Sequence, residues 1–450
     1  MATTSLEFTP ASAGDQTKWT WSGWIKRSDV ETGSQVFFNG YDSGTNETRM
    51  YFSSSETLNF TNYLSSSADG EYITNRKFAD PGAWYHLVFA WDSDNATPGD
   101  RIRIYVNGVE ETSFSTEDDP SSGSASIINK DEPQYLGKSG SGQNFDGVMA
   151  HVHFCDGQAY AASDFGETDA TSGIWVAKTS PSVTYGTNGF FLKFQDAAAF
   201  GDDSSGNGND FTVSGTMTQT KDTPDNNFST LNPLNMPLTP FPSYTNGNTT
   251  VTSQSGAGKN FGGTSTLSVS SGKWYVEGKV ISGIANGGQI GFTGSAQSDA
   301  YLNDGPGNSA FAYGYVNNGN KRNDSTETAY GNTYTDGDII GVALDLDNLK
   351  IYFSKNGVWE NSGDPTSGAT GTGAAFTVTT PSSTTEGVYA FSCADYGNTP
   401  IVWSTNFGNG YFGTTIVSSS ESDDAGIGSF EYDVPAGYYA ICTTNLGDQS

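Results

Sequence analysis

The sequence predicts an all-β protein made of two antiparallel β-sandwiches joined by a proline-rich arm. Gly accounts for 56 of 450 residues, and aromatic residues reach 13% beside a charged fraction of 16%. Such a composition is typical of short strands joined by tight turns. Two stretches, WYHLVFAWDSDNATPGDRIRIYVNGVE at 84–110 and GDIIGVALDLDNLKIYFSKNGVW at 337–359, repeat one pattern of two strands. The chain is long enough for two separate cores.

Each of these stretches ends in an Asn-Gly pair followed by Val. Asn-Gly suits a two-residue hairpin turn, which needs positive φ at both central positions. Because the hairpin occurs in two distant parts of the chain, we predict two domains. The predicted division is a first sandwich over 1–220, a proline-rich linker or docking arm over 221–250, a second sandwich over 251–418, and an acidic spacer with a short C-terminal apolar segment over 419–450.

The first sandwich is predicted from the alternation of its apolar residues. In KWTWSGWIKRS, alternation places Trp19 and Trp21 on one face of a strand and Trp24 on the other. The segment 84–92 is apolar on both faces, which is typical of a central strand. Residues 102–106 alternate apolar and polar side chains, and they predict a strand with one face in the core.

The other segments complete the predicted organisation. A short helix is expected at 159–167. Residues 221–250 contain five prolines and no periodicity, as a linker or an extended arm does. The apolar residues of that segment favour a docked arm over a free tether, and they are Phe228, Leu231, Leu234, Met236, Leu238 and Phe241. Strands of the second sandwich are expected at 272–281, 287–294, 310–316, 338–347, 349–357 and 387–395.

Charge and cysteine content limit the partners and the compartment. The net charge of −30 repels phosphate groups, so we expect no nucleic-acid partner and no anionic membrane partner. No apolar run approaches the ~20 residues of a membrane span, so no membrane insertion is expected. The three cysteines, Cys155, Cys393 and Cys442, form no disulfide framework. The first residues lack the basic and apolar regions of a secretory signal, and we expect synthesis in a reducing cytoplasm.

The first predicted sandwich resembles the laminin-G/concanavalin A-like lectin superfamily. The matching pieces are WSGWIKRS at 21–28, WYHLVFAWD at 84–92, IRIYVNGVE at 102–110 and the closing Phe145-Asp146-Gly147 motif with the strand after it. Family members usually begin with a strand and a segment like DDSSGNGNDFTVSG, which here lies at 202–215, after that motif. The resemblance therefore implies a circularly permuted order, which the neighbouring ends of a sandwich permit.

The second predicted sandwich resembles the SPRY/B30.2 domain through GKWYVEGKV at 272–280, GQIGFTG at 288–294 and the segment at 336–359. The pair of domains, with the tail SFEYDVPAGYYAICTTNL, is similar to virion proteins of tailed bacteriophages, particularly marine ones. This resemblance implies a virion structural or adhesion protein: a fibre, a spike or a decoration subunit, on head or tail. The implied partners are other virion proteins, host-surface glycans and further copies of the chain.

Two alternatives to this function are a SPRY-type adaptor that captures a protein and a carbohydrate-active enzyme of the concanavalin A-like glucanase type. Glycoside hydrolysis needs two carboxylates about 5–5.5 Å or about 6.5–9.5 Å apart. The Glu431-Tyr432-Asp433 sequence lies in the tail, with Pro435 where a second acid would stand. We identify no acid pair on a concave strand of the first sandwich, and we expect a protein that is not an enzyme.

Two segments have residues that can bind metal. In AHVHFCDG, alternation places His151, His153 and Cys155 on one strand face, where imidazole and thiolate can bind zinc. The alternative is a strand whose Val152 and Phe154 face the core and whose other face is solvated. Calcium, the one cofactor predicted, needs hard oxygen ligands on a turn. Its candidate ligands are Asp202, Asp203, Ser205, Asn207 and Asn209, and the alternative is an Asx-rich turn bonded to its own side chains.

A ligand site is predicted in the second sandwich, at 311–338, where tyrosines lie beside asparagines. Sugar rings stack on aromatic faces, and sugar hydroxyls bond to amides and carboxylates. For the alternating Tyr313 and Tyr315, a core position is an equally good interpretation. The candidate residues for binding a glycan or a protein are Tyr313, Tyr315, Asn317, Asn318, Tyr330 and Tyr334.

Overall fold

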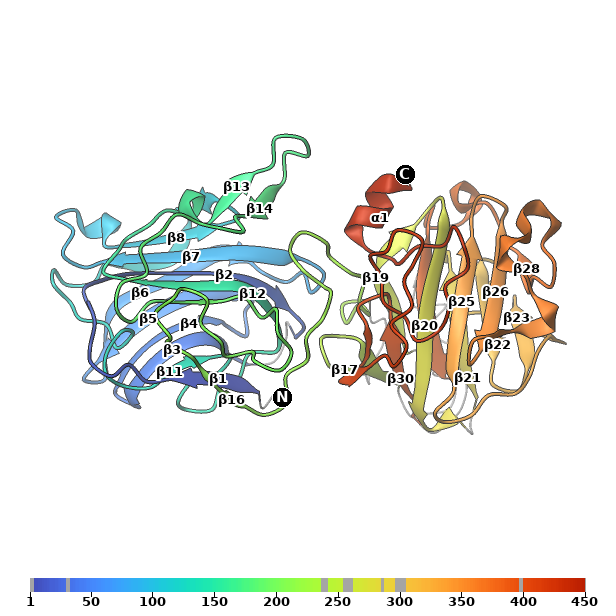
Figure 1. Cartoon of the computed structure of the whole chain (residues 1–450), viewed down its shortest axis with the longest axis horizontal. Coiled ribbons are helices and arrows are strands. Elements are labelled where there is room, and N and C mark those ends of the chain that lie inside the picture. The colour runs from blue at the N-terminus through green and yellow to red at the C-terminus, as the bar shows by residue number, and fades with distance from the viewer. Residues whose placement is uncertain are drawn as a thin grey trace. The chain divides into compact units, whose positions relative to one another are not determined.

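The computed structural model describes residues 4–29, 33–235, 242–253, 262–284, 287–295, 305–395 and 400–449. The chain divides into two compact units, residues 1–219 and 220–450. Both are β-sandwiches, as the composition predicts, and Figure 1 shows the strands of each. Among the described residues, no helix is long and apolar enough to cross a membrane.

The first unit stacks an eight-stranded sheet on a six-stranded sheet. The larger sheet runs in the order β10 (Phe114–Asp118), β6 (Ser67–Lys77), β5 (Thr57–Leu64), β4 (Asn46–Phe52), β3 (Gln35–Ser43), β11 (Gln134–Leu136), β1 (Ser5–Phe8) and β16 (Thr212–Ser214). The smaller sheet runs in the order β15 (Phe190–Leu192), β12 (Gly147–Asp156), β2 (Lys18–Arg27), β7 (Trp84–Asp92), β8 (Ile102–Val106) and β9 (Val109–Glu110).

The core of the first unit confirms the predicted alternation. Trp19 and Trp21 are fully buried between the sheets, whereas Trp24 packs on the opposite face of β2. Strand β7 is central, between β2 and β8. The segment that follows the Phe145-Asp146-Gly147 motif supplies β15 and β16, which occupy one edge of each sheet. Residues 189–214 therefore complete the sandwich.

The predicted helix at 159–167 is wrong. The structure has only a single 3₁₀ turn there, at Ala162–Asp164. Phe165 and Ala162 are buried against Val88 and Cys155, on the face of the smaller sheet that points away from the core. The segment follows the sheet surface as irregular chain and then forms the hairpin of β13 (Gly166–Thr168) and β14 (Trp175–Ala177).

The second unit also pairs two large sheets. One sheet is β17 (Ser243–Thr245), β18 (Thr250–Thr252), β30 (Val402–Asn406), β20 (Lys273–Ser282), β25 (Ile339–Asp345), β26 (Lys350–Lys355) and β27 (Val358–Trp359), with β28 (Phe376–Thr377) paired to β26. The other is β19 (Gly263–Val269), β29 (Tyr389–Asp395), β21 (Gly288–Thr293), β22 (Ala312–Val316), β23 (Asn320–Asn323) and β24 (Thr326–Ala329). A short hairpin of β31 (Tyr411–Phe412) and β32 (Thr415–Ile416) and one helix, α1 (Thr443–Asp448), follow.

The two predicted Asn-Gly turns have nearly the same geometry. The φ angles are +48° and +82° at Asn107 and Gly108, and +49° and +78° at Asn356 and Gly357. In both turns the Asn Oδ1 accepts a backbone N–H from the strand that pairs with the one before the turn, at 2.8 Å from His86 N of β7 in one and 2.9 Å from Ile339 N of β25 in the other. The positive φ angles at both central residues agree with the predicted type of turn.

The described part of the arm is docked on the second unit. Leu231 is fully buried in the core and pairs with Ser265, and Phe228 pairs with Cys442 of the C-terminal segment. Met236, Leu238 and Phe241 lie outside the described residues. Aromatic residues of the C-terminal segment cover an outer face of β20, β25 and β26, so the arm and the tail together add a third layer. The buried residues of this layer and of the sheet face beneath it are Phe228, Tyr275, Ala343, Tyr352, Phe430, Tyr438, Ala440 and Cys442.

Glu277 of β20 anchors the C-terminal segment. Its side chain is 0% exposed. Oε2 accepts the backbone N–H of Glu431 at 2.9 Å and the Asn406 side-chain amide at 3.2 Å, and Oε1 accepts the Tyr432 N–H at 2.9 Å. Burial raises the pKa of Glu277 to about 7 against these hydrogen bonds, which lower it.

Candidate functional site

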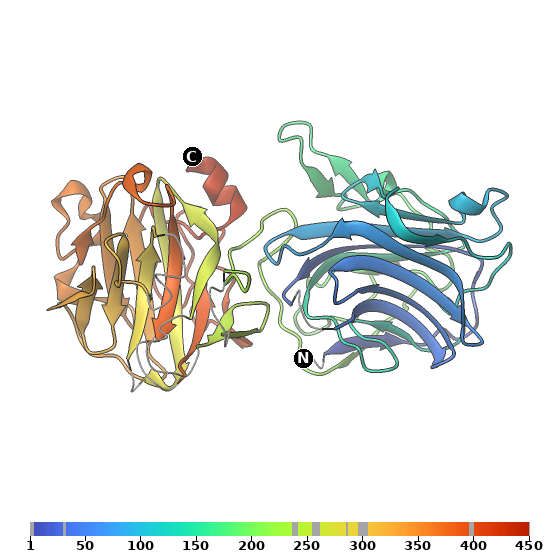
Figure 2. The same cartoon turned by 180° about the vertical axis from the view of Figure 1, so that it is seen from behind.

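The outer face of the larger sheet of the first unit holds the strongest candidate site. Figure 2 shows the blue strands of this sheet from behind. Along β3, β4 and β5, the side chains of Phe38, Met50 and Phe60 point into the core. Successive strand residues point to opposite faces. The polar residues between them, such as Arg49 and Thr61, therefore lie on the face away from the core.

Polar side chains on this outer face form one row across six adjacent strands. Glu7 lies opposite Tyr135, and each further member lies opposite the next on the neighbouring strand. We call this set the polar row. Its members, in order across the sheet, are Glu7, Tyr135, Asn39, Arg49, Thr61 and Glu71.

Arg49 is the centre of the polar row. Its guanidinium lies 4.7 Å from the ring centroid of Tyr51 and 5.7 Å from that of Tyr63. Arg49 Nη1 is 3.3 Å from Glu47 Oε1 and donates to Gln143 Oε1, also at 3.3 Å. Cation, carboxylate, amide and aromatic faces thus meet within two strands and one loop.

Three buried polar atoms at this centre lack a hydrogen-bond partner among the described residues: Glu47 Oε2, Arg49 Nε and Thr61 Oγ1. Thr61 is 0% exposed and Glu47 is 7% exposed. Leaving a buried polar group unpaired costs about 1–3 kcal/mol. Such groups are rare in native proteins, and each needs an explanation. All three atoms are closed to solvent, so a ligand would meet this centre through the partly exposed atoms of Arg49 and Tyr63.

Glu47 and Glu71 are two acids of this face that lie on different strands. Glu47 on β4 lies opposite Tyr63, and Glu71 on β6 lies opposite Thr61. Two strand spacings and two residues separate their backbones, which is about 12 Å. Glu47 Oε1 is also 3.3 Å from Arg49 Nη1, so this acid is engaged at the centre of the polar row.

A serine and a histidine meet on the other sheet, but in a pairing that does not activate the serine. His86 Nε2 lies 2.9 Å from Ser22 Oγ. Trp175 Nε1 donates to His86 Nδ1 at 3.0 Å, so the ring proton sits on Nε2 and points to the serine. Burial lowers the pKa of His86 to about 3. A nucleophile needs a base that takes its proton, and here the histidine donates instead.

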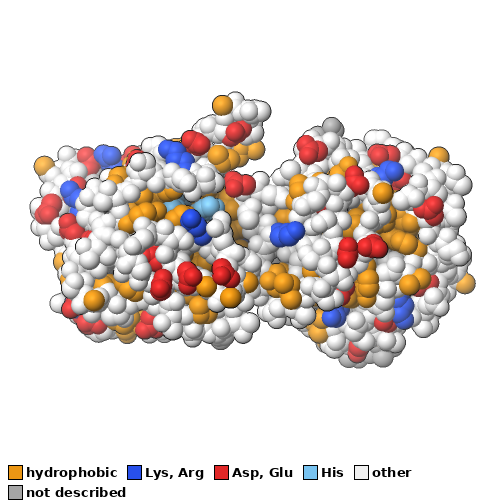
Figure 3. All heavy atoms as spheres, viewed as in Figure 1, with side chains coloured by type: hydrophobic (Ala, Val, Ile, Leu, Met, Phe, Trp, Pro, Cys, Tyr) orange, Lys and Arg blue, Asp and Glu red, His pale blue; other side chains and the backbone are white. Residues whose placement is uncertain are grey.

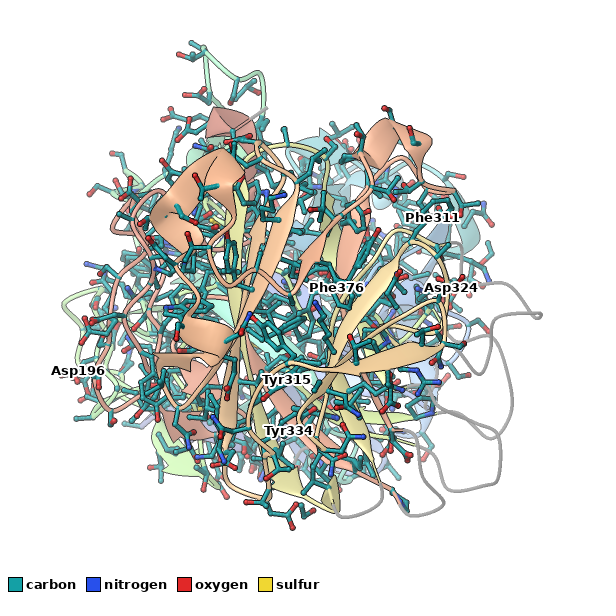
Figure 4. The ribbon with its side chains drawn as sticks, turned by 90° about the vertical axis from the view of Figure 1, so that its right-hand side faces the viewer. Asp196, Phe311, Tyr315, Asp324, Tyr334 and Phe376 are labelled. Atoms are coloured by element: carbon teal, nitrogen blue, oxygen red, sulfur yellow. The ribbon has the colours of Figure 1, made fainter. Side chains whose placement is uncertain are left out.

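The tyrosines of the ligand site predicted in the second unit do not lie on the surface. Tyr313, Tyr315, Tyr330 and Tyr334 all belong to the buried core, at 4%, 0%, 9% and 1% exposure. Figure 4 labels Tyr315 and Tyr334 among the strands. Tyr334 Oη donates to a backbone carbonyl and Tyr315 Oη donates to the carbonyl of Asn332. The prediction that sugars stack on these rings is therefore wrong, because buried ring faces are closed to a ligand.

The two asparagines of that prediction lie nearer the surface. Asn317 is half-buried, and its amide donates to the carbonyl of Ile284 at 2.9 Å. Asn318 is exposed and donates to Glu327 Oε2 at 2.9 Å. Asn317 thus has a structural partner, and a ligand role for Asn318 stays a prediction.

The predicted calcium loop is bonded to itself. Asp203 Oδ1 accepts the N–H groups of Phe191 and Ser205, and its Oδ2 accepts the Ser205 hydroxyl and the Asn209 N–H. The Asn207 and Asn209 amides donate to backbone carbonyls that include Gly189 O. Among the described residues, no cluster of His, Cys, Asp or Glu could hold a metal ion. Calcium binding with Asp202 in this loop stays a prediction.

The predicted common face of His151, His153 and Cys155 is wrong. The register of β12 shifts between Ala150 and His153, and His151 has a φ of +48°. This bulge breaks the alternation on which the prediction depended. His153 stacks on Phe191 with 3.9 Å between ring centroids, and Cys155 is 0% exposed.

Comparison with known families agrees with both folds. Residues 2–163 match the concanavalin A-like lectin/glucanases superfamily, and residues 273–394 match the SPRY domain. The chain joins a concanavalin A-like domain to a SPRY domain. No curated protein matches the sequence. The polar row belongs to the concanavalin A-like domain, because all six of its strands lie within the matched residues.

Solved structures resemble parts of this chain at low identity. They include a native heptameric SAP-like pentraxin from Limulus polyphemus, 16% identical over 39% of this chain and 86% of that chain, with a TM-score of 0.28. The SPRY domain of human HERC1 is 18% identical over 39% of this chain and 96% of that chain, with a TM-score of 0.29. Domain 4 of AbnA, a GH43 extracellular arabinanase from Geobacillus stearothermophilus in complex with arabinotriose, is 19% identical over 34% of this chain and 65% of that chain, with a TM-score of 0.25. These low scores carry no functional argument.

Proposed function

We propose that this protein is a non-enzymatic adhesion protein whose concanavalin A-like domain binds glycans on its outer sheet face. The observation that carries the proposal is the centre of the polar row. The Arg49 guanidinium and the Tyr63 ring are both partly exposed there, 5.7 Å apart, and Glu47 Oε1 is 3.3 Å from Arg49 Nη1. Hydroxyl groups and the apolar face of a sugar match this set of groups.

Binding to immobilised glycans tests this function directly. The full chain is applied to a glycan array, with Arg49→Ala as the variant and Arg103→Ala, at a partly exposed arginine on β8, as the matched control. We expect the parent protein and the control to bind at least one glycan class and Arg49→Ala to bind at least tenfold more weakly. Equal binding by all three proteins, or none by the parent, would contradict the proposal.

We propose further that the protein is a subunit of a virus particle and is held there by other virion proteins. The resemblance of the domain pair and tail to tailed-bacteriophage virion proteins supports this role. The acidic surface, seen as scattered carboxylates in Figure 3, suits a particle that stays dispersed. Mass spectrometry and a density map of purified particles test it: the chain should appear at fixed, stoichiometric positions, and its absence from particles would refute the role.

The same proposal assigns no bond-breaking chemistry to the protein. The ion pair between Glu47 and Arg49 supports this part, because it engages the acid at the centre of the polar row. Purified protein is incubated with common polysaccharides, and reducing ends are measured over time. We expect no release above a buffer control. Reproducible release that disappears in Glu47→Gln would establish an enzyme instead.

A further inference from the structure

We infer that acid opens a flap on the concanavalin A-like domain and uncovers an aromatic surface on the outer face of its smaller sheet. The flap is the hairpin of β13 and β14 with its loop, residues 166–177, and Figure 1 shows it projecting from the first unit. Three features carry the inference: the ring that docks the flap on the sheet, the histidine that holds this ring, and the charges around that histidine.

Trp175 is the side chain that docks the flap. Its ring packs in both apolar clusters on the outer face of the smaller sheet. Two glycines lie against the ring: a Cβ would lie 2.5 Å from it at Gly108 of the neighbouring turn and at Gly166 of the flap. Residues 167–174 are by contrast mostly exposed, and Ile174 is 63% exposed. The hold of the flap on the sheet therefore depends mainly on one ring.

His86 of β7 holds the ring of Trp175. The indole Nε1–H donates to His86 Nδ1 at 3.0 Å, and the two rings stack with 6.0 Å between centroids. Trp24 also stacks on His86, at 4.9 Å between centroids, and His86 Nε2 lies 2.9 Å from Ser22 Oγ. Because an indole N–H only donates, His86 Nδ1 must accept, and the imidazole must be neutral while the flap is closed.

Protonation of His86 removes the bond that holds the flap. A proton on Nδ1 turns this acceptor into a donor, which would then face the indole N–H of Trp175. The imidazolium would also be poorly hydrated, because His86 is 1% exposed between two tryptophan rings. Opening the flap relieves both costs, since it removes the indole and brings water to the imidazole.

The charges around His86 do not stabilise its protonated form. The carboxylate of Glu167 points away from the sheet, because Gly166 and Thr168 share the other side of β13 with the ring of Trp175. Asp92 lies at the far end of β7 and is paired with Lys18 at 3.1 Å. The other titratable side chains on this face of the elements packed against His86 are Lys26 of β2, Arg103 and Tyr105 of β8, and His151, His153 and Cys155 of β12.

The coupling of the flap to pH follows from the two environments of His86. In the closed state, burial lowers its pKa to about 3, and the charge of His151 lowers it further in the same direction. A histidine in water has a pKa of about 6.5. The closed state is therefore fully favoured above pH 6.5, and the ratio of open to closed flap rises up to tenfold for each pH unit below it. The surface that opening uncovers includes Trp24 and Trp84, which are 4% and 8% exposed when covered.

Hydrogen exchange of the Trp175 indole proton in the full chain tests the inference. The chain is labelled with nitrogen-15 tryptophan, and Trp175→Phe assigns the signal. Dividing the exchange rate by that of free indole at the same pH gives the opening constant of the flap. We expect this constant to rise about a hundredfold from about pH 7.5 to about pH 4.5. The indole proton of Trp19, which is bonded to Ser126 Oγ in the core, should show no such rise.

His86→Gln separates this histidine from general effects of acid, because glutamine keeps a donor and an acceptor but does not titrate. We expect its opening constant to change less than about threefold over the same interval. His151→Gln, at a partly exposed histidine of β12, is the matched control and should retain most of the rise. Circular dichroism with a thermal melt checks that both variants fold. A constant opening equilibrium in the parent protein, an equal rise at Trp19, or an undiminished rise in folded His86→Gln each overturns the inference.

Discussion

At the scale of single residues, the carboxyl group of Glu277 combines a raised pKa with a structural role. It is fully buried beneath the C-terminal segment, and four groups donate toward its two oxygens: the backbone N–H groups of Glu431 and Tyr432, the Asn406 amide and the Tyr275 hydroxyl. Its pKa is raised to about 7 from an ordinary value of 4.5. Because the folded state binds this proton more tightly than the unfolded state, folding is coupled to pH.

The sign of that coupling gives a testable pH dependence. A raised pKa in the folded state stabilises the protein below pH 4.5, and this stabilisation is lost as the pH rises to about 7. We expect the free energy of unfolding of the SPRY domain to fall by roughly 3 kcal/mol across this window from Glu277. Denaturant titrations at several pH values measure it. Glu277→Gln should remove this dependence, and the exposed Glu386→Gln should retain it.

The turn glycines are a second feature at the residue scale. A Cβ at Gly108 would lie 2.5 Å from the ring of Trp175, and a Cβ at Gly357 would lie 2.6 Å from the ring of Tyr432. Both glycines also have positive φ. An aromatic ring from a later segment of the same unit thus packs against each turn.

Substitution of these glycines should therefore destabilise each domain. We expect Gly108→Ala and Gly357→Ala each to lower the free energy of unfolding by at least about 1 kcal/mol, from backbone strain and the displaced ring. Gly99→Ala, in open space without positive φ, is the control and should change stability little. Thermal or denaturant unfolding measures the effect, and equal stability of all three variants would contradict the packing described for the rings.

At the scale of elements, the third layer of the SPRY domain is a feature that we expect to stabilise that domain. Phe430 and Tyr438 of the C-terminal segment pack on Tyr275 and Tyr352 of the sheet. Helix α1 follows and is tied back by the Thr443 N–H, which donates to Asn227 O of the arm at 3.0 Å. The arm and the tail therefore hold each other as well as the sheet.

Truncation at residue 418 tests this layer. Removing residues 419–450 exposes the apolar sheet face beneath the layer and leaves Glu277 without its two backbone donors. We expect a lower melting temperature for the SPRY domain and stronger binding of a hydrophobic dye at room temperature. Calorimetry and dye fluorescence measure these changes. An unchanged melting temperature would show that the layer adds no stability.

The elements also show how far sequence reasoning reaches. Short-range patterns predicted the two hairpins, the central strand β7 and the inward faces of Trp19 and Trp21, because alternation and turn chemistry are local. The bulge before His153 and the burial of Tyr315 are set by distant strands, so alternation alone misplaced them. The polar row was missed for the same reason: NETRMYF and TLNFTNYL do alternate, but their register with β3 and β11 is not readable locally.

At the scale of the whole molecule, the chain consists of two units with their own cores. Residues 1–219 form one and residues 220–450 the other. The arm belongs to the SPRY unit, where Leu231 and the strands β17 and β18 contribute to its core and sheet. The boundary thus falls before the arm, and the arm is no free tether.

Independent folding of the two units follows from this division. We expect fragments 1–219 and 220–450, expressed separately, each to give a cooperative melt and a dispersed amide spectrum. A fragment that begins at 251 should be less stable than one that begins at 220, because it lacks Phe228 and Leu231. Calorimetry and NMR of the three fragments provide the comparison, and a molten 220–450 fragment would contradict it.

The aromatic rings that pack on Gly108 and Gly357 restrict how these hairpins can vary in length among homologues. An inserted residue at either Asn-Gly turn would displace the glycine and remove the surface on which the aromatic side chain packs. Among the described residues, no such ring packs on a glycine at the opposite end of each hairpin, and there the connections already differ in length, Ser93 to Arg101 in one and Leu346 to Leu349 in the other. Among homologues, length variation should therefore accumulate at that end, while the Asn-Gly end keeps its two-residue length.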